Sequence, residues 1–369
     1  MQAQTFSFSS QTWRRLKKNK LAFTGLIIIV LFFLIAVFGY MIAPDNTTNA
    51  DLQTVEIQAK KPGYSQLFLK IPDKKNDETT WLHHFFLGTT SQFRYLPISS
   101  YSIQGNNIVV NKFIDEDTTV QQSYNINQLT GNDPGQIKKY LVTKKFLLGT
   151  DAFGRDILSR LIIGTRVSLA VGLIAVIVSL LLGILLGALA GYYRGWVDEI
   201  IMWLVNVTWS IPTLLLVFAI TIALGKGFWQ IFIAVGLTMW VSVARLVRGQ
   251  VLSIKELEFV QAAKALGFTN SRIIIKHILP NIMGPLLVIA AGNFATAIII
   301  EAGLSFLGIG VQPPQPSWGL MIKENYNFII THNPFLALIP GFAIMILVLA
   351  FNLLGNGLRD AMDVKNNSK

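Results

Sequence analysis

Long apolar segments alternate with shorter polar ones along most of this chain. Segments of about 20 apolar residues with few charges are long enough to cross the hydrocarbon core of a bilayer as helices. The pattern therefore predicts an all-α polytopic membrane protein with six transmembrane helices. The predicted helices are residues 21–43, 167–191, 200–224, 228–244, 282–308 and 335–354.

The first apolar segment follows a strongly basic stretch, WRRLKKNK at 13–20. A secretory signal peptide has a shorter apolar core and a small-residue cleavage site, so we interpret 21–43 as an uncleaved helix. Basic residues favour the cytoplasmic ends of membrane helices, which places residues 1–20 in a cytoplasmic tail. An even number of crossings then makes residues 357–369 a second cytoplasmic tail.

Residues 44–155 differ from the rest of the chain because they are polar and rich in turn-forming residues. Short β-prone pieces are separated by the turn-like sequences QGNN and TGNDPG. This pattern predicts a small β-rich domain, inserted on the extracellular side between the first two helices. The β-prone pieces are YSQLFLKI at 64–71, YLPISSYSI at 95–103 and NNIVVNKFI at 106–114.

Residues 156–356 form the remaining five-helix membrane core in this prediction. Pro212, within SIPTLLL, has no amide hydrogen and predicts a kink or break in the third helix. Gly183, Gly187 and Gly191 are spaced by four and share one helix face. They predict a close contact with another helix, either inside the same bundle or at a subunit interface.

A polar, helix-forming stretch, ELEFVQAAKALGFTNSRIIIKHILP at 256–280, lies within the predicted cytoplasmic loop 245–281. Gly267 can adopt the left-handed conformation that ends a helix, and a polar residue at 269–271 can cap a second one. Such a helix lies either on lipid headgroups or in the groove of a soluble partner, and the pattern leaves both open. The first helix carries one apolar stripe at helical spacing, formed by Phe259, Ala262, Ala263 and Leu266.

The sequence QAAKALG, followed by nine residues and HILP, resembles the EAA loop of ATP-binding-cassette (ABC) importer permeases. The resemblance implies the ABC type I importer permease fold, in which this loop forms a coupling helix that seats in a cleft of the ATPase subunit. Gln261 replaces the usual glutamate and cannot form a salt bridge, and His277 replaces an aliphatic residue. Phe259, Gln261 and Leu266 are expected to join the matching residues in this contact. The residues that match at the family's spacing are Ala262, Ala263, Gly267, Leu279 and Pro280.

Four further motifs resemble the peptide-importer branch of this family and its second, C-type permease subunit. They are WRRLKKNKLAFTGLIII at 13–29, LGTDAFGRDILSRLIIGTRVSL at 148–169, GYYRGWVDE at 191–199 and EAGLSFLGIGVQPPQPSWG at 301–319. The resemblance implies an importer of oligopeptides in the bacterial cytoplasmic membrane, with dipeptides or nickel as alternative substrates. Its implied partners are a second homologous permease, two ATPase subunits that bind ATP and magnesium, an extracellular substrate-binding protein, the peptide and membrane lipids. The chain itself is then a transport subunit without a cofactor, and not an enzyme.

The sequence GTDAFGRD at 149–156 superficially resembles a phosphate-binding loop, but Arg155 occupies the lysine position and Asp156 the hydroxyl position. A carboxylate there would repel phosphate, so we predict no ATP hydrolysis by this chain. Asp151, Arg155 and Asp156 are instead available for ion pairs at the outer-face entry to the second helix. They form either a structural turn or a gate or contact for the binding protein.

Two polar residues within the predicted membrane helices are candidates for the translocation path. Glu301 is surrounded by apolar neighbours in FATAIIIEAGLSFLG. Ionisable groups in such positions are costly and usually face the bundle or a water-filled cavity, so Glu301 either lines the translocation path or holds helices together. Asn206 lies in the third span, where relatives often have aspartate, and is a second candidate for the path.

Composition and charge argue against several other classes of function. The chain has no cysteine, which excludes disulfides and thiolate metal sites, and its four histidines form no metal-binding pattern. The net charge of +11 comes from basic residues that flank apolar segments, without the aromatic platforms of nucleic-acid binding. An ion-coupled secondary transporter and a membrane-anchored sensor are rival functions. Glu301 alone gives the first little support, and a six-span body would have no purpose in the second.

Overall fold

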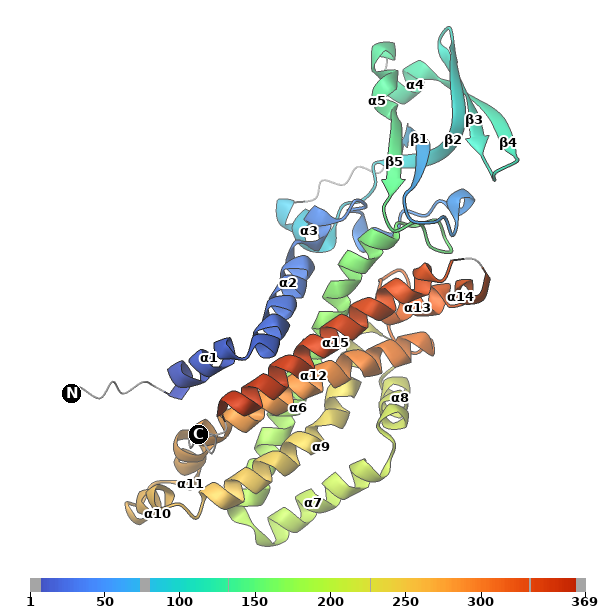
Figure 1. The fold of residues 1–369 in the computed structure, drawn as a ribbon. Helices are drawn as coiled ribbons and strands as arrows, with labels where there is room; N and C mark the ends of the chain where they lie inside the picture. Colours follow the sequence, from blue (N-terminus) through green and yellow to red (C-terminus); the bar gives the residue numbers. More distant parts are fainter. Residues whose placement is uncertain (1–7, 74–79, 132, 226, 332, 363–369) are drawn as a thin grey trace, which may run out of the picture. The chain divides into compact units, whose positions relative to one another are not determined.

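The computed structural model describes residues 8–73, 80–131, 133–225, 227–331 and 333–362 (Figure 1). Its contacts divide the chain into two compact units. The first unit comprises Met1–Phe33, Ser168–Gln312 and Ala343–Lys369, and the second comprises Leu34–Val167 and Pro313–Phe342. Because neither unit is one continuous stretch, residues far apart in the sequence contact each other within each of them.

The described residues contain five helical stretches that are long and apolar enough to cross a membrane. Two more helices, α7 (Gly195–Ser210) and α8 (Thr213–Leu224), form an apolar pair bent by 97°. The bend confirms the break predicted at Pro212. If α7 and α8 are counted together as one span, the described residues contain six spans. The five stretches are α2 (Lys20–Ile42), α6 (Ile157–Tyr193), α9 (Phe228–Ile254), Asn270–Phe306, which ends in α12 (Met283–Phe306), and α15 (Phe335–Met362).

Several predicted helices were too short. Helix α6 begins at Ile157 rather than 167, and α9 continues to Ile254, so the predicted loop 245–281 begins as helix. Charged residues late in α9 ended the apolar pattern early, although they pair with α7 as described below. Helix α15 likewise continues through residue 357 to Met362, which makes the first part of the predicted tail helical.

The predicted N-terminal tail contains a helix that the sequence analysis did not predict, α1 (Phe8–Lys18). Its Leu16 is buried against Ala22 of α2 and Ala361 of α15. The apolar contact therefore packs α1 within the first unit. Residues 1–7 and 363–369 of the two predicted tails lie outside the described residues.

Helices α6 and α9 approach each other closely in the first unit. A Cβ atom added at Gly187 would come within 2.5 Å of the Ala244 carbonyl oxygen, and one at Gly191 within 2.8 Å of the Arg248 carbonyl oxygen. Gly183 faces Val243 of α9 in the same way. The predicted glycine contact is thus confirmed as packing inside this chain.

The second unit contains a five-stranded antiparallel sheet with the order β4-β3-β2-β1-β5 (Figure 1). The three predicted β-prone pieces form β1, β2 and β3, whereas the more polar β4 and β5 were missed. One face of the sheet packs against the short helices α4 (Ile126–Thr130) and α5 (Ile137–Tyr140) through Leu69, Ile98 and Ile108. The strands are β1 (Tyr64–Pro72), β2 (Phe93–Gln104), β3 (Asn107–Phe113), β4 (Thr119–Asn125) and β5 (Leu141–Phe146).

Short helices complete both units. In the first unit they are α10 (Glu258–Ala265), α11 (Asn270–Ile273), the π-helical η4 (Ile274–Ile278) and the 3₁₀-helical η5 (Leu279–Ile282). In the second unit they are η1 (Thr48–Ala50), η2 (Val55–Ile57), α3 (Trp81–Leu87), η3 (Pro134–Gln136), α13 (Trp318–Asn325) and α14 (Phe328–Thr331).

Gly187→Ala should destabilise the protein, because the new Cβ atom would press against backbone that cannot move independently. Overpacking of this kind costs about 1–3 kcal/mol, so the purified complex should unfold at a lower temperature. Gly249→Ala in α9 is the matched control, since a Cβ atom there has no neighbour within 4 Å. Equal melting temperatures for the two variants would contradict the close α6–α9 contact.

Candidate functional site

The EAA-like stretch folds into a helical hairpin in which α10 ends at a left-handed glycine. Gly267 has a φ of +79°, and its N–H donates to the Lys264 carbonyl oxygen at 3.0 Å. The N–H of Phe268 donates to the Ala263 carbonyl oxygen at 3.2 Å, which completes a Schellman motif. The predicted helix stop is confirmed, and Thr269 occupies the position that precedes α11.

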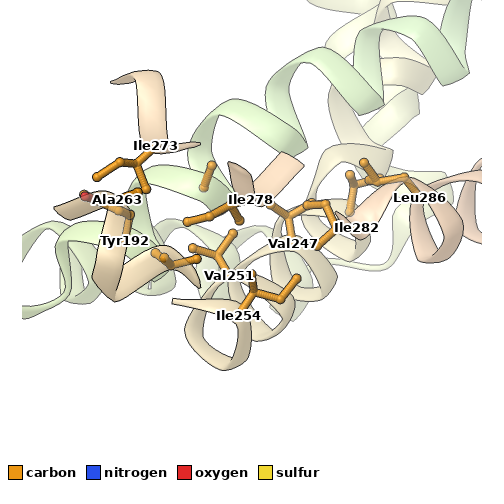
Figure 2. Close-up of a cluster of buried hydrophobic side chains, with 12 residues drawn as sticks. Tyr192, Val247, Val251, Ile254, Ala263, Ile273, Ile278, Ile282 and Leu286 are labelled. Atoms are coloured by element: carbon orange, nitrogen blue, oxygen red, sulfur yellow. The ribbon is translucent and has the colours of Figure 1, made fainter. Parts of the chain in front are cut away.

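A buried apolar cluster, which we call the hairpin cluster, fixes this hairpin to α6 and α9 (Figure 2). Figure 2 shows side chains of the hairpin directed toward Tyr192 at the end of α6 and toward the last turns of α9. The hairpin and the ends of two membrane helices therefore share one core. Its members are Ala188, Tyr192, Val243, Val247, Val251, Ile254, Val260, Ala263, Ile273, Ile278, Ile282 and Leu286.

The predicted apolar stripe of α10 does not act as a single surface. Ala263 turns inward with Val260, which lay off the predicted stripe, and both are buried in the hairpin cluster. Ala262 is exposed, and so are Phe259 at 44% and Leu266 at 74%. An exposed group of apolar side chains on a well-anchored helix is typical of an interaction surface.

Gln261 and His277, which depart from the EAA pattern, each make a contact within the hairpin region. The Gln261 side-chain amide donates to the Lys255 carbonyl oxygen at 2.9 Å, which an ionised glutamate cannot do. The His277 ring stacks on Phe268 with 5.9 Å between centroids, and the Arg272 guanidinium lies 4.3 Å from the Phe268 centroid. Both residues therefore stabilise the hairpin itself.

The matched residues Leu279 and Pro280 lie where the hairpin enters α12. Leu279 is half-buried beside the hairpin cluster, whereas Pro280 is exposed. Since Pro280 has no amide hydrogen, the regular helical ladder is interrupted here. The Asn281 side-chain amide donates to the His277 carbonyl oxygen at 2.7 Å and satisfies one backbone acceptor.

Helices α7 and α9 are joined by arginine contacts. The Arg245 guanidinium donates to Asn206 Oδ1 at 2.8 Å and lies 3.7 Å from the centroid of the Trp209 ring. Arg248 makes a bidentate pair with Asp198, at 2.5 Å and 2.6 Å. Asn206, predicted to face the translocation path, is exposed and holds an arginine of the neighbouring helix.

Glu301 is fully buried in α12. The Ser305 hydroxyl donates to Glu301 Oε1 at 2.7 Å and accepts from the Val311 N–H at 3.0 Å. The carboxyl group therefore holds the chain that follows α12 against the helix. These contacts lie within α12 and the turn after it, so the choice between lining the path and holding helices together stays a prediction.

A recess lies at the break between α7 and α8, with a volume of about 250 Å³. Its lining combines hydroxyl and amide side chains from four helices with a few apolar ones. Irregular backbone within a membrane is tolerated where it lines a cavity, and broken helices often form substrate sites. The polar residues of this recess are Thr208, Thr213, Thr238, Ser242, Asn293 and Thr296.

A buried ion cluster forms in the second unit around Arg155. Its guanidinium donates to Asp151 Oδ2 at 2.7 Å, to Asp51 Oδ1 at 3.1 Å and to Glu324 Oε2 at 2.6 Å. Arg160 of α6 also donates to Glu324 Oε2, at 3.0 Å. Burial alone would lower the pKa of Arg155, but the Asp151 and Glu324 carboxylates raise it above its usual value.

Asp156 lies beside this cluster and caps the start of α6. It accepts from the N–H of Ser159 at 2.9 Å and from the Ser159 hydroxyl. Burial raises the pKa of Asp156, while the bonds from Ser159 oppose the rise. Asp151, Arg155 and Asp156 are all buried, so the geometry matches a structural turn. Asp51 and Glu324 were not predicted as members of the cluster, because they are distant from Arg155 along the chain.

Comparisons with known proteins agree with this architecture. Residues 183–366 match the model of the binding-protein-dependent transport system inner membrane component. Residues 7–62 match the model of the N-terminal transmembrane domain of oligopeptide transport permease C. The chain therefore belongs to the family of binding-protein-dependent transport permeases, in the C-type subunit branch of the peptide importers.

Two relatives whose transport systems are named align with this chain over most of their length. The chain is 46% identical over 220 residues to a dipeptide transport system permease protein of Alkalihalophilus pseudofirmus, covering 60% of this chain and 72% of that protein. It is 43% identical over 218 residues to a glutathione transport system permease protein of Pectobacterium atrosepticum, covering 59% and 72%. The chain is thus a multi-pass membrane permease subunit of an ABC importer.

Part of this chain also aligns with a chain of the inward-facing MetNI methionine ABC transporter. The alignment covers 56% of this chain and 97% of the matched chain, with 20% sequence identity and a TM-score of 0.47.

Glu324→Gln should destabilise the second unit, because it removes the carboxylate that Arg155 and Arg160 share. Breaking a buried ion pair from one side costs about 3 kcal/mol, so the variant should unfold at a clearly lower temperature. Glu116→Gln is the matched control, since Glu116 pairs with Lys60 but is 83% exposed, where such pairs contribute about 0–1 kcal/mol. Equal losses in both variants would show that the buried cluster does not stabilise the fold.

Proposed function

We propose that this chain is one of two permease subunits of an ATP-driven importer of short peptides, and that α10 couples it to an ATPase subunit. The dipeptide and glutathione systems named for its relatives support a short peptide as the substrate. The sequence predicted oligopeptides, with dipeptides or nickel as alternatives, and this choice of substrate stays a prediction. The system would lie in the bacterial cytoplasmic membrane, with an extracellular binding protein that delivers the solute.

The proposed coupling role rests on the exposed apolar residues of α10. Phe259, Ala262 and Leu266 are exposed, while Val260 and Ala263 of the same helix are fixed in the hairpin cluster. A lipid-inserting helix usually carries a larger apolar face than one leucine, one phenylalanine and an alanine. A helix that seats in a protein groove needs only a few such anchors.

The hairpin cluster would transmit motion of α10 to the membrane helices. Motion imposed on α10 from outside passes through close-packed side chains to the ends of α6 and α9, because packed cores transmit displacement rather than absorb it. The ATPase subunits would bind ATP and magnesium and close on each other, and the membrane helices would switch between two arrangements. The permease itself carries out no covalent chemistry in this scheme.

The proposed orientation rests on the basic residues before α2 and on the side of the membrane where the hairpin would meet an ATPase. The basic stretch before α2 favours the cytoplasmic side for that end of the helix. The hairpin must lie on the cytoplasmic side to meet an ATPase that uses cellular ATP. We infer that both chain ends share that side and that the β-sheet domain lies outside the cell.

The recess at the α7–α8 break is our candidate for a part of the translocation path. Its hydroxyl and amide groups suit a peptide backbone, which offers donors and acceptors of the same kind at every residue.

The nickel alternative can be tested separately. Among the described residues, no group of three His, Asp or Glu side chains has the arrangement to hold a metal ion. Competition between a dipeptide and nickel ions for uptake would separate the two substrate classes directly.

Leu266→Asp should weaken binding of the ATPase subunit without disturbing the permease fold, because Leu266 makes little contact within the chain. Burying a leucine at an interface contributes about 2 kcal/mol, so the affinity should fall roughly tenfold or more. ATP-driven peptide uptake in proteoliposomes should fall with it. Ala263→Arg would be a poor test, since Ala263 is buried and its replacement would disrupt the hairpin cluster.

Ile330→Asp is the control for this variant, because Ile330 of α14 is 92% exposed and lies far from α10 in the sequence. It should leave ATPase binding and uptake unchanged. Wild-type coupling in Leu266→Asp, at normal membrane levels, would overturn the role of α10. Uptake driven by an ion gradient without any ATPase would favour the rival secondary transporter.

Glu301→Gln should leave peptide uptake close to that of the wild type, because the amide oxygen can still accept the Ser305 hydrogen bond. Glu301→Leu removes this acceptor inside the bundle, at a cost of about 1–3 kcal/mol, and should lower the amount of folded protein. Membrane levels and uptake rates measured together separate the two effects. Lost uptake in Glu301→Gln at normal abundance would assign the carboxyl group to the translocation path instead.

A further inference from the structure

Helix α3 of the second unit is short, aromatic and unusually exposed. Its sequence is WLHHFFL, and it lies between strands β1 and β2 along the chain. Exposed apolar side chains gathered on one small helix usually mark a surface that meets a partner or a membrane. The four most exposed apolar residues, between 52% and 69% exposed, are Trp81, Leu82, Phe86 and Leu87.

Two contacts fix α3 beside the end of the membrane helix α2. The Phe85 ring meets the Phe38 ring edge to face, with 5.9 Å between centroids. The Arg166 guanidinium donates to the Phe86 carbonyl oxygen at 2.8 Å and lies over the Tyr40 ring. Phe38 precedes the end of α2 at Ile42 by about one helical turn, which is roughly 6 Å along the axis.

The end of α2 beside α3 also exposes apolar side chains. Phe38, Met41 and Ile42 are each more than 40% exposed, as expected of a helix that faces lipid. An α3 in contact with Phe38 cannot be far from the boundary between hydrocarbon and headgroups. Its exposed aromatic and aliphatic side chains therefore lie at the depth where tryptophan and other aromatic residues concentrate in membrane proteins.

We propose that α3 is an interfacial helix that inserts Trp81, Leu82, Phe86 and Leu87 into the bilayer leaflet at the sheet-domain end of α2. A short helix with exposed aromatic and aliphatic side chains binds an interface through the apolar area that it buries there. The two histidines of α3 supply polar groups next to this apolar surface. In this position α3 anchors the second unit to lipid at a point separate from the membrane helices.

A recess between α2 and α3 supports this position. It has a volume of about 250 Å³ and is lined by aromatic rings and by polar side chains. Mixed walls of this kind suit the headgroup and glycerol region of a phospholipid, which is itself partly polar. Its lining includes Tyr40, Trp81 and Phe85 on the aromatic part and Asn46, His84 and Thr89 on the polar part.

The absence of cysteine from the sequence allows a direct test with spin labels on single introduced cysteines. Phe86→Cys is labelled in the complete importer in lipid nanodiscs, and its collisions with oxygen and with a water-soluble nickel chelate are measured. Leu34→Cys on α2 is the lipid-facing control, and Val120→Cys on β4 is the water-exposed control. An identically treated complex without the introduced cysteine corrects for labelling of partner subunits.

A spin label at Phe86→Cys should favour oxygen over the nickel chelate, as at Leu34→Cys and unlike Val120→Cys. A chelate accessibility equal to that of Val120→Cys would place α3 in water and overturn the proposal. Low accessibility to both reagents would place α3 under a protein partner and would also overturn it. Leu82→Cys provides a second site in case Phe86→Cys does not fold. The result depends on α2 crossing the membrane and does not depend on the transported substrate.

Discussion

The close contact between α6 and α9 is the interaction on which the rest of the first unit depends. Membrane helices gain little from apolar burial against each other, since lipid is equally apolar, so they associate mainly through close packing. Three glycines on one face of α6 allow the α9 backbone to approach within van der Waals contact. The ends of both helices then lie side by side and form the platform on which the hairpin cluster is built. Without the glycines, the hairpin that contains α10 would lose this common support.

Several polar groups of the membrane helices have a fixed partner. Arg245 and Arg248 tie α9 to α7, and Ser305 connects Glu301 to the chain after α12. Because a buried charge without partners would be very costly, each of these groups also fixes one local arrangement. The exposed apolar residues of α10 are the opposite case. They are tolerated on a helix that is already anchored, which leaves its outer face available to a partner.

The predictions from sequence succeeded where one residue has a strong local effect. Pro212 predicted the break between α7 and α8 because it lacks an amide hydrogen, and Gly267 predicted the end of α10 because it can adopt a positive φ. They failed where the structure depends on contacts between distant residues. Glu324 gave no signal of its own, although it completes the ion cluster of Arg155. Val260 was overlooked because the stripe of α10 was assigned without knowing which side meets α6 and α9.

Helix α1 and helix α3 were missed for different reasons. The sequence before α2 was interpreted by its charge alone, so the helical contacts of Leu16 could not be foreseen. The signal for α3 is present in the sequence, since five of the seven residues in WLHHFFL are apolar or aromatic within an otherwise polar segment. Its contacts with Phe38 and Arg166 show that this apolar piece lies beside a membrane helix rather than inside the sheet domain.

The way in which the sheet domain is attached explains how the family core accommodates it. The two family matches, at 7–62 and 183–366, leave the sheet between them. Where the chain leaves the sheet, the Thr150 hydroxyl donates to the Ile57 carbonyl oxygen and the Thr150 N–H donates to the Lys60 carbonyl oxygen. The two ends of the insertion are therefore joined directly by hydrogen bonds. An insertion whose ends lie together adds a domain without separating the elements that flank it, which is the arrangement that folded proteins tolerate best.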